Sequence, residues 1–303
     1  MPDSGEPQIR ALRSLDDCRA VVSIQEEVWG RDGETVPASV LFVSAKRGGI
    51  LLGASMPSRE YFSEKSTPRF ALTPLAGFVW SMPGVRDDGK RTHWSHMLGV
   101  LPAYRQHRLG ERLKWAQRER ALEQGAELIE WTFDPLQAAN AHFNLQVLGG
   151  LGASYGVDIY GALAGPLHRG TPTDRLIVEW RIDAPHVHRR YDARHSSGGS
   201  RLMGARSADI LNARAAIGVV ERDGWTQVGG VIPAHDERRF LLPIPPRFLE
   251  MQQQATDRAL AWRLAVREVM TDAFAKGYRA VDFFLNREQG GGSYLFARDE
   301  SAT

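Results

Sequence analysis

One stretch of the chain places a basic turn between a strand-like and a helix-like segment, HWSHMLGVLPAYRQHRLGERLK over residues 93–114. The turn carries Arg105, His107 and Arg108, and Gly110 stands near the start of the helix-like segment. The first N–H groups of a helix have no partner within the helix and carry a partial positive charge, so they bind phosphate groups. A glycine there lets the anion approach the backbone closely. These residues therefore predict a site for a phosphate or a pyrophosphate.

The strand-like segment THWSHMLGV carries a side chain that could accept a proton. Alternation along a strand puts His96 on the same face as Leu98 and Val100, with His93 on the opposite face. A histidine suits general-base chemistry because its pKa lies near neutrality. The alternative reading is a structural histidine that is fully hydrogen-bonded.

Acidic side chains in the segment EWTFDP are further candidate bases. Alternation puts Glu130, Thr132 and Asp134 on one face of a strand. Glu130, near the middle of that strand, is the second candidate after the histidine. Asp134 is the third, although an aspartate that precedes a proline at a strand end is more typical of a turn.

The elements that must position these residues follow from local signals. Ser14 precedes LDDCRAVVSIQEEVWG and Asp17 follows it by three residues, a pair that predicts the start of a helix ending at Gly30. Before the basic turn we predict strands over residues 40–46, 50–55, 75–82 and 92–101. After it we predict a helix over 109–124, a strand over 126–134, a helix over 136–148 and a strand over 175–182. A strand meander followed by alternating helices and strands predicts an α+β fold with a mixed α/β sheet.

The composition changes after Ile182. The stretch DAPHVHRRYDARHSSGGSRLMGARS is rich in Arg, His, Gly and Ser and has no periodicity, which predicts a linker over 184–206. The predicted domains are therefore 1–183 and a smaller α+β C-terminal module over 207–303. In this module we predict strands over 215–221, 226–232, 239–244, 278–285 and 291–298 and a helix over 250–275.

Composition and charge bear on the class of protein. Of 303 residues, 43% are hydrophobic and 24% are charged, which is ordinary for a globular protein with a core. A net charge of +2 argues against a dedicated nucleic-acid surface. The single cysteine, Cys18, cannot form an internal disulfide, and no apolar run approaches the roughly 20 residues of a membrane span, so we expect a cytoplasmic protein. No metal site is predicted, because His186 and His188 lack acidic or cysteine neighbours.

The segment MLGVLPAYRQHRLGERL resembles the acyl-CoA-binding motif of the GNAT superfamily of acyltransferases. The matching positions are Val100, Pro102, Arg105, Arg108, Leu109 and Gly110. The sequence departs from the family pattern at Arg108, which stands where the family has its first glycine. The segments GFVWSMPGV, LKWAQRERALEQGAELIEWTFDPLQAANAHFN, PTDRLIVEW and ALAWRLAVREVMTDAFAKGYRAVDFF extend the resemblance over nearly the whole chain, to one subfamily with a C-terminal extension.

The resemblance implies a GNAT-like N-terminal domain that uses acetyl-CoA or another acyl-CoA as co-substrate, with no metal. It implies that a backbone N–H near Val100 stabilises the oxyanion. It also implies a tyrosine that protonates the departing thiolate; the helix over 136–148 has none, so Tyr160 is the candidate. Together with the residue patterns above, the candidate catalytic residues are His96, Glu130 and Tyr160, and the candidate cofactor-binding residues are Leu98, Val100, Arg105, Gln106, His107, Arg108, Leu109, Gly110 and Asn140.

Three functions are consistent with these features. The first is direct N-acyl transfer from acyl-CoA to a primary amine of a small metabolite such as an amino acid. The second is a non-catalytic acyl-CoA-binding or regulatory protein, which Arg108 and the lack of a carboxylate on the strand THWSHMLGV would fit. The third gives the basic linker and the C-terminal module a protein- or RNA-docking role. We expect no membrane or nucleic-acid partner for the first function, and we allow for a homodimer.

Overall fold

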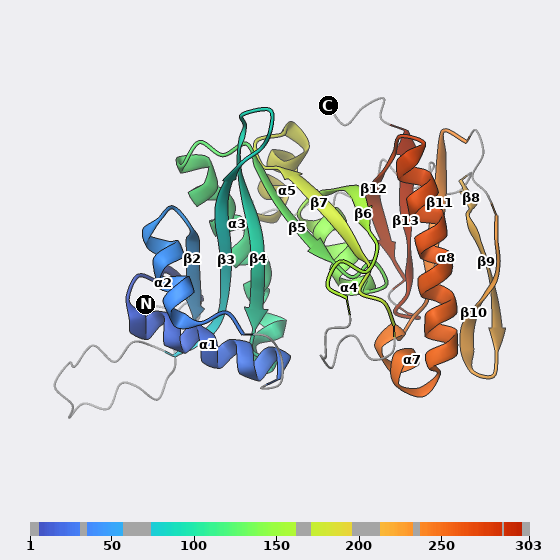
Figure 1. The fold of residues 1–303 in the computed structure, drawn as a ribbon, viewed down its shortest axis with the longest axis horizontal. Coiled ribbons are helices and arrows are strands. Elements are labelled where there is room, and N and C mark those ends of the chain that lie inside the picture. Colours follow the sequence, from blue (N-terminus) through green and yellow to red (C-terminus); the bar gives the residue numbers. More distant parts are fainter. Residues whose placement is uncertain are drawn as a thin grey trace. The chain divides into compact units, whose positions relative to one another are not determined.

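The computed structural model describes residues 6–30, 35–56, 74–161, 171–195, 213–232, 237–286 and 288–298, and for Gln106 the backbone alone. The chain divides into two compact units, residues 1–129 and 130–303. Strand β5 (Leu128–Phe133) carries the chain from the first unit to the second. Each unit is described by itself, and most of its helices and strands are labelled in Figure 1.

The first unit contains four antiparallel strands in the order β1–β2–β3–β4. Its elements are β1 (Gln8–Ala11), α1 (Leu15–Trp29), α2 (Ala38–Lys46), β2 (Ile50–Ser55), β3 (Leu75–Val85), β4 (Arg91–Val100), the 3-10 helix η2 (Pro102–His107) and α3 (Leu109–Glu123). Helices α1 and α2 contribute to one core with strands β2 and β3, made of Leu12, Cys18, Val21, Ile24, Leu41, Leu51, Phe78 and Trp80. The predicted strand, turn and helix over residues 92–124 are confirmed.

Helix α1 begins as its sequence predicts. The Ser14 hydroxyl accepts a hydrogen bond from the backbone N–H of Asp17, and the Asp17 carboxylate accepts one from the backbone N–H of Ser14. This reciprocal capping satisfies two N–H groups that the first turn of a helix leaves without partners. Gly30 follows the last helical residue, so the predicted end is confirmed as well.

The predicted strand over residues 40–46 is wrong, since the structure has helix α2 there. Pro37 is the N-cap residue of this helix and has the extended backbone conformation that is usual at that position. Leu41 is buried in the core, while Val40 and Val43 remain exposed. A short apolar run such as VLFVSAK fits a helix and a strand equally well, and tertiary contacts decided between them.

The second unit contains a mixed sheet with strand order β7–β6–β12–β13–β11–β8, in which β8 runs parallel to β11. A separate two-stranded sheet pairs β9 with β10. The elements after β5 are α4 (Ala138–Ala141), the π-helix η3 (His142–Val147), β6 (Leu151–Gly156), β7 (Arg175–Arg181), α5 (Pro185–His195), β8 (Arg214–Ala215), β9 (Ile217–Arg222), β10 (Trp225–Val231), β11 (Arg239–Ile244), α7 (Phe248–Gln254), α8 (Thr256–Ala275), β12 (Tyr278–Leu285) and β13 (Gly292–Arg298). The predicted mixed α/β class is confirmed.

Helix α5 lies within the stretch that composition marked as a linker, so the expected lack of structure is wrong for residues 185–195. The half of the helix towards its start is anchored by Val187, which is fully buried, and by the His186 ring, whose Nε2 lies 3.0 Å from the Gly149 carbonyl oxygen. Residues 196–206 of the predicted linker lie outside the described residues. The domain boundaries at 183 and 207 stay a prediction.

Helix α8 is the longest helix of the described chain and contacts β6, β10, β11 and β12. Trp262 is fully buried and its indole N–H donates to the Thr226 carbonyl oxygen of β10 at 2.8 Å. Among the residues that the structure describes, no helix combines the length and the apolar character that a bilayer span requires.

Candidate functional site

The basic turn has a backbone conformation that explains its sequence pattern. Strand β4 ends at Val100, η2 follows, and Arg108 then joins η2 to α3 with φ 55° and ψ 25°, in the left-handed region. Glycine adopts this conformation without strain, whereas a residue with a Cβ meets a penalty of about 1–2 kcal/mol. A glycine would therefore suit position 108 without strain, and the arginine adopts this conformation under strain.

The side chain of Arg108 turns back along helix α3. Its Nε donates to Glu111 Oε2 at 2.9 Å and its Nη2 donates to Glu111 Oε1 at 2.8 Å. Glu111 is largely buried, with its side chain 9% exposed, and the arginine is half-exposed. A two-point ion pair of this kind fixes the guanidinium beside the helix. The arginine also neutralises a carboxylate that would otherwise oppose an anion at the helix start.

The first turn of α3 has no side-chain cap among the described residues. The start of a helix without such a cap offers backbone N–H groups to an anion. A Cβ built on Gly110 would lie 3.7 Å from Leu98 Cδ2 and 3.9 Å from Val100 Cγ2, which are ordinary contacts. The structure thus brings Leu98, Val100 and Gly110 together. Arg105 is exposed, and its Nε lies 3.4 Å from the Val100 carbonyl oxygen.

Leu109 follows Arg108 as the first residue of α3 and is fully buried, so its side chain anchors the helix start. His107, the last residue of η2, is exposed, with its ring centroid 6.5 Å from that of Tyr104. The backbone of Gln106 lies in η2, and its side chain lies outside the described residues.

The amide of Val100 has a direction that bears on its predicted role. The Leu101 N–H donates to the Ala76 carbonyl oxygen at 2.9 Å, so the backbone N–H of Leu101 points towards β3. Because backbone groups alternate between the two edges of a strand, the N–H of Val100 points to the edge of β4 that is opposite β3. An N–H in this position could donate to a group outside the β3–β4 pair.

A β-bulge in β4 changes the faces that simple alternation predicts. Ser95 pairs with Ser81 and Met97 pairs with Trp80, so His96 is the extra residue between them. The His96 ring lies edge-on to Trp80, with centroids 5.2 Å apart and planes at 76°. Trp80 belongs to the core beneath α1 and α2. The prediction that His96 shares a face with Leu98 and Val100 is therefore wrong; its catalytic role stays a prediction.

His93 takes the position on the α3 side that alternation gave to His96. It is 1% exposed; its Nδ1 lies 3.1 Å from the Ser81 hydroxyl and its Nε2 lies 2.9 Å from Gln124 Oε1. Burial lowers the pKa of His93, and the hydrogen bond with Gln124 opposes this shift. His93 is a structural histidine. His96 is exposed at its edge, and desolvation of its ring lowers its pKa below the ordinary value, which favours the neutral form that can accept a proton.

The sequence analysis missed a buried polar group between α3 and β4. Lys114 is almost completely buried, and its ammonium donates to Ser95 Oγ at 3.1 Å and to Gln117 Oε1 at 2.8 Å. Burial lowers the pKa of Lys114 well below its ordinary value. The signal available in the sequence was the spacing of Lys114 and Gln117, three residues apart on one helix face. These contacts fix α3 against the strand that carries Val100.

In the second unit, Glu130 and Thr132 are half-buried residues of β5 that alternate with buried Trp131 and Phe133. The Tyr160 hydroxyl lies 3.3 Å from Thr132 Oγ1, and the Tyr160 side chain is partly exposed. The guanidinium carbon of Arg175 lies 5.1 Å from the centroid of the Tyr160 ring. Tyr160 thus contacts strand β5 at Thr132, which is two residues further along the strand than Glu130.

Asn140, the other predicted cofactor contact, is exposed within the short helix α4. Asn144, four residues further along the chain, is buried in η3. Their exposure therefore separates the two asparagines, and Asn140 is the one whose side chain is accessible.

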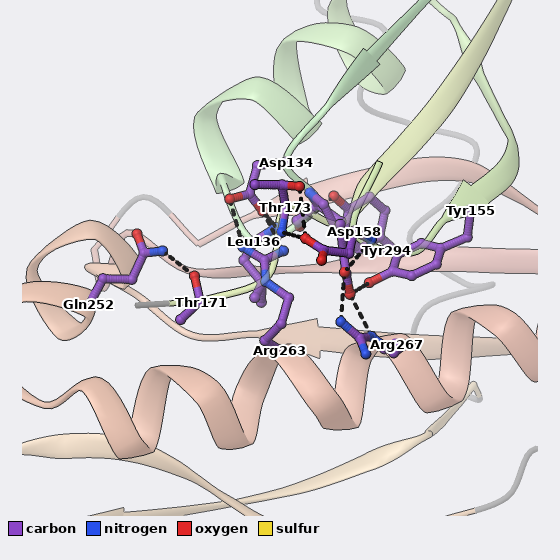
Figure 2. A network of polar contacts seen from close by, with 12 residues as sticks. Asp134, Leu136, Tyr155, Asp158, Thr171, Thr173, Gln252, Arg263, Arg267 and Tyr294 are labelled. Atoms are coloured by element: carbon purple, nitrogen blue, oxygen red, sulfur yellow. Dashed lines mark hydrogen bonds and ion pairs between the residues drawn. The ribbon is translucent and has the colours of Figure 1, made fainter. Parts of the chain in front are cut away.

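Asp134 is not free to act as a base. Both of its carboxylate oxygens accept hydrogen bonds from Arg263 at 2.8 Å, and one also accepts from the Leu136 backbone N–H at 2.9 Å (Figure 2). The side chains of this pair are 1% and 8% exposed. The third-ranked candidate base is therefore wrong, and the reading of Asp134 as a turn former is confirmed.

No group of three His, Cys, Asp or Glu side chains within the described ranges is placed to hold a metal ion. His186 and His188, which form the H-x-H pair, bind a backbone carbonyl and the Asp183 carboxylate respectively.

Comparisons with known proteins give matches among solved structures. The chain is similar to an acetyltransferase of the GNAT family from Streptococcus pneumoniae, with 17% identity over 57% of this chain and 98% of that chain and a TM-score of 0.43. It is also similar to the NatC complex bound to Gag peptide and CoA, with 14% identity over 58% of this chain and 98% of that chain and a TM-score of 0.43. A third match is an aminoglycoside acetyltransferase from an uncultured soil sample, with 15% identity over 45% and 84% and a TM-score of 0.37. No protein-family model and no curated protein matches the chain.

Proposed function

We propose that this protein transfers an acyl group directly from an acyl-CoA to a primary amine of a small metabolite such as an amino acid. The observation that carries the proposal is the start of α3, whose first turn contains Gly110 and has no side-chain cap. This turn is joined to the end of β4 by η2 and is flanked by Arg105, Arg108 and Arg112. Such a turn offers backbone N–H groups and positive charge to a pyrophosphate. The sequence motif of the same residues resembles the acyl-CoA site of the GNAT superfamily.

In the proposed reaction the amine nitrogen attacks the thioester carbon, and the carbon–sulfur bond breaks as the amide bond forms. The N–H of Val100, which points away from β3, donates to the oxygen that becomes negatively charged. His96 or Glu130 takes the proton that the amine loses, and Tyr160 supplies a proton to the departing thiolate. The pyrophosphate at the start of α3 fixes the cofactor relative to the strand that carries Val100.

Calorimetric titration of acetyl-CoA and succinyl-CoA into the wild type, Gly110→Ala and Gly110→Glu tests the site. Alanine fits the ordinary contacts with Leu98 and Val100, whereas glutamate adds bulk and a negative charge where the phosphates bind. We expect micromolar binding to the wild type and to Gly110→Ala, and a loss of at least 100-fold in folded Gly110→Glu, because a like charge opposes a helix-start anion. Lack of binding to the wild type would overturn the proposal.

Release of free CoA thiol in a mixture of amines then tests the reaction. Turnover that depends on an added amine supports acyl transfer and identifies the acceptor. Tight acyl-CoA binding without thiol release over a range of acyl chains would contradict the enzymatic function and would indicate a non-catalytic acyl-CoA-binding protein.

A further inference from the structure

Two arginines of helix α8 form ion pairs with aspartates in the segments around Tyr160. Arg263 and Arg267 are four residues apart and therefore lie on one face of the helix. Arg263 binds both carboxylate oxygens of Asp134, at the end of β5. Arg267 binds Asp174 in the same two-point manner, with its Nε at 2.9 Å and its Nη2 at 2.8 Å (Figure 2). The C-terminal module thus contacts the segments that carry the candidate chemistry of the second unit.

The Asp174 carboxylate is the centre of a buried network. Its side chain is 0% exposed, and it also accepts hydrogen bonds from the Tyr155 hydroxyl at 2.7 Å and from the Asp158 backbone N–H at 3.0 Å. The bonds from Arg267, Tyr155 and the Asp158 N–H all come from donors, which stabilise the ionised form. A buried carboxylate of this kind requires its cation, because an unpaired buried charge is strongly unfavourable. Arg267 therefore stabilises the negative charge of Asp174, and Asp174 in turn holds the backbone of the loop at Asp158.

From Asp158 the contacts lead to Tyr160. The Asp158 carboxylate accepts from the Thr173 backbone N–H at 2.8 Å and from the Thr173 hydroxyl at 3.0 Å. The same hydroxyl oxygen accepts from the Tyr160 backbone N–H at 3.0 Å. Asp158 itself has φ 47°, a left-handed conformation that needs such support outside glycine. The backbone of Tyr160 is thus held by a chain of short contacts that begins at α8.

The hydroxyl group of Tyr160 contacts strand β5, and helix α8 binds the residue that follows the end of the same strand. Its hydroxyl lies 3.3 Å from Thr132 Oγ1 on β5, and Arg263 holds Asp134 two residues further along. Helix α8 therefore supports both partners of the Tyr160–Thr132 contact, one through Arg267 and the other through Arg263. Since a proton donor must lie within about 3 Å of its target, a loose tyrosine loop would lose its function.

We propose that Arg267 is a positioning residue, by which the C-terminal module holds Tyr160 in place for protonation of the departing thiolate. This inference rests on the proposed acyl transfer and gives the C-terminal module a function within it. Arg267 acts through Asp174 and the Asp158 loop and does not touch a substrate.

Helix α8 provides a matched control. Arg258, on the same helix, makes a single-contact ion pair with the exposed Asp223 at 2.7 Å. We compare Arg267→Gln, Arg258→Gln and Tyr160→Phe, together with the double variant of Arg267→Gln and Tyr160→Phe. For Arg267→Gln we expect kcat to fall at least 10-fold while the Kd of acetyl-CoA stays within about threefold, since removing proton transfer alone costs roughly 100-fold or more. The double variant should be no slower than Tyr160→Phe.

Non-additive effects of Arg267→Gln and Tyr160→Phe support the proposal, because a residue that acts only through Tyr160 has nothing left to position in the phenylalanine variant. Effects that multiply, or an equal loss of kcat in Arg258→Gln, would overturn it. Should Arg267→Gln fail to fold, Arg267→Lys keeps the charge and loses the two-point contact; unchanged kcat in this variant would also overturn the proposal.

A second readout needs no activity and separates this inference from the proposed function. In protein labelled with 3-fluorotyrosine, the Tyr160 resonance is assigned by its absence in Tyr160→Phe. We expect this resonance to shift towards that of free fluorotyrosine in Arg267→Gln or Arg267→Lys and to stay unchanged in Arg258→Gln. A wild type without turnover would reject acyl transfer, whereas an unmoved resonance would reject the positioning by Arg267.

Discussion

At the scale of single residues, Arg108 combines a strained backbone conformation with a side-chain ion pair that stabilises the start of α3. Its left-handed conformation lets α3 start directly after η2, and the ion pair with Glu111 holds its side chain against the helix. The Cβ carries the strain of the left-handed conformation, and the guanidinium makes the ion pair. Substitutions can therefore separate the two contributions.

We predict that Arg108→Gly is more stable than Arg108→Ala by about 1 kcal/mol. Both variants remove the ion pair with Glu111, so the difference reports the strain of a Cβ at φ 55°. Urea unfolding of the two variants measures it. Equal stabilities would mean that residue 108 is not left-handed in solution. Acyl-CoA affinity should change by less than about threefold between the two variants, because neither changes the N–H groups of the turn.

At the scale of elements, the bulge in β4 decides what the two histidines can do. It leaves His93 buried between Ser81 and Gln124 and places the His96 ring in a T-shaped contact with Trp80. The same strand then resumes its alternation, so that Leu98 and Val100 lie near Gly110. One additional residue thus separates a structural histidine from an accessible one.

The accessible histidine gives a test of the general base. If His96 takes the proton, His96→Ala lowers kcat roughly 100-fold or more and leaves the Kd of acetyl-CoA unchanged. Since desolvation lowers the pKa of His96, the pH–rate profile of the wild type should have an ascending limb below about pH 6.5. This ascending limb should be absent in His96→Ala. A limb that persists in His96→Ala and vanishes in Glu130→Gln would assign the base to Glu130 instead.

A second comparison of elements concerns the sequences of residues 115–133 and 264–284. In both, a helix ends at a glycine with positive φ and a strand follows: α3, Gly125 and β5 in one case, and α8, Gly277 and β12 in the other. Glycine is the usual residue for this left-handed end of a helix. The shared pattern therefore has a sufficient local cause, and it predicts the order of elements without requiring a repeated domain.

At the scale of the whole molecule, the second unit is held together by ion pairs between segments that are distant in sequence. Asp134 and Arg263 are 129 residues apart, and Asp174 and Arg267 are 93 residues apart. Both carboxylates are buried and both pairs have two-point geometry. Pairs of this kind specify one arrangement, because a displaced partner would leave a buried charge without compensation.

The Asp174 pair predicts a dependence of stability on pH. Burial raises the pKa of Asp174, but the hydrogen bonds from Arg267 and Tyr155 outweigh burial and hold the pKa below its ordinary value. Such a carboxyl stabilises the fold above its unfolded pKa of about 3.9, and this stabilisation is lost as the pH falls through the lower, folded pKa. Asp174→Asn should therefore cost about 2–3 kcal/mol at pH 7 and less at pH 3.

Urea unfolding of the wild type and Asp174→Asn at both pH values measures this change. Asp223→Asn, at an exposed pair, serves as the control and should cost less than about 1 kcal/mol at either pH. A cost for Asp174→Asn that is the same at pH 7 and pH 3 would contradict the assignment of a low pKa.

The sequence by itself determined the features that local chemistry controls. Ser14 and Asp17 set the start of α1, and the segment from His93 to Lys114 predicts a strand, a basic turn and a helix whose start suits a phosphate. Capping, glycine ends and periodicity act within a few residues, so their signals can be read without knowledge of distant partners.

Only the tertiary structure decided between alternatives that are locally equivalent. Residues 40–46 became a helix, His96 left the face that alternation gave it, and Asp134 became the partner of Arg263 rather than a base. In each case the deciding contact joins residues that are far apart along the chain or depends on an irregularity in strand pairing. Such contacts have no local signature, because their free energy appears only when the distant partner is in place.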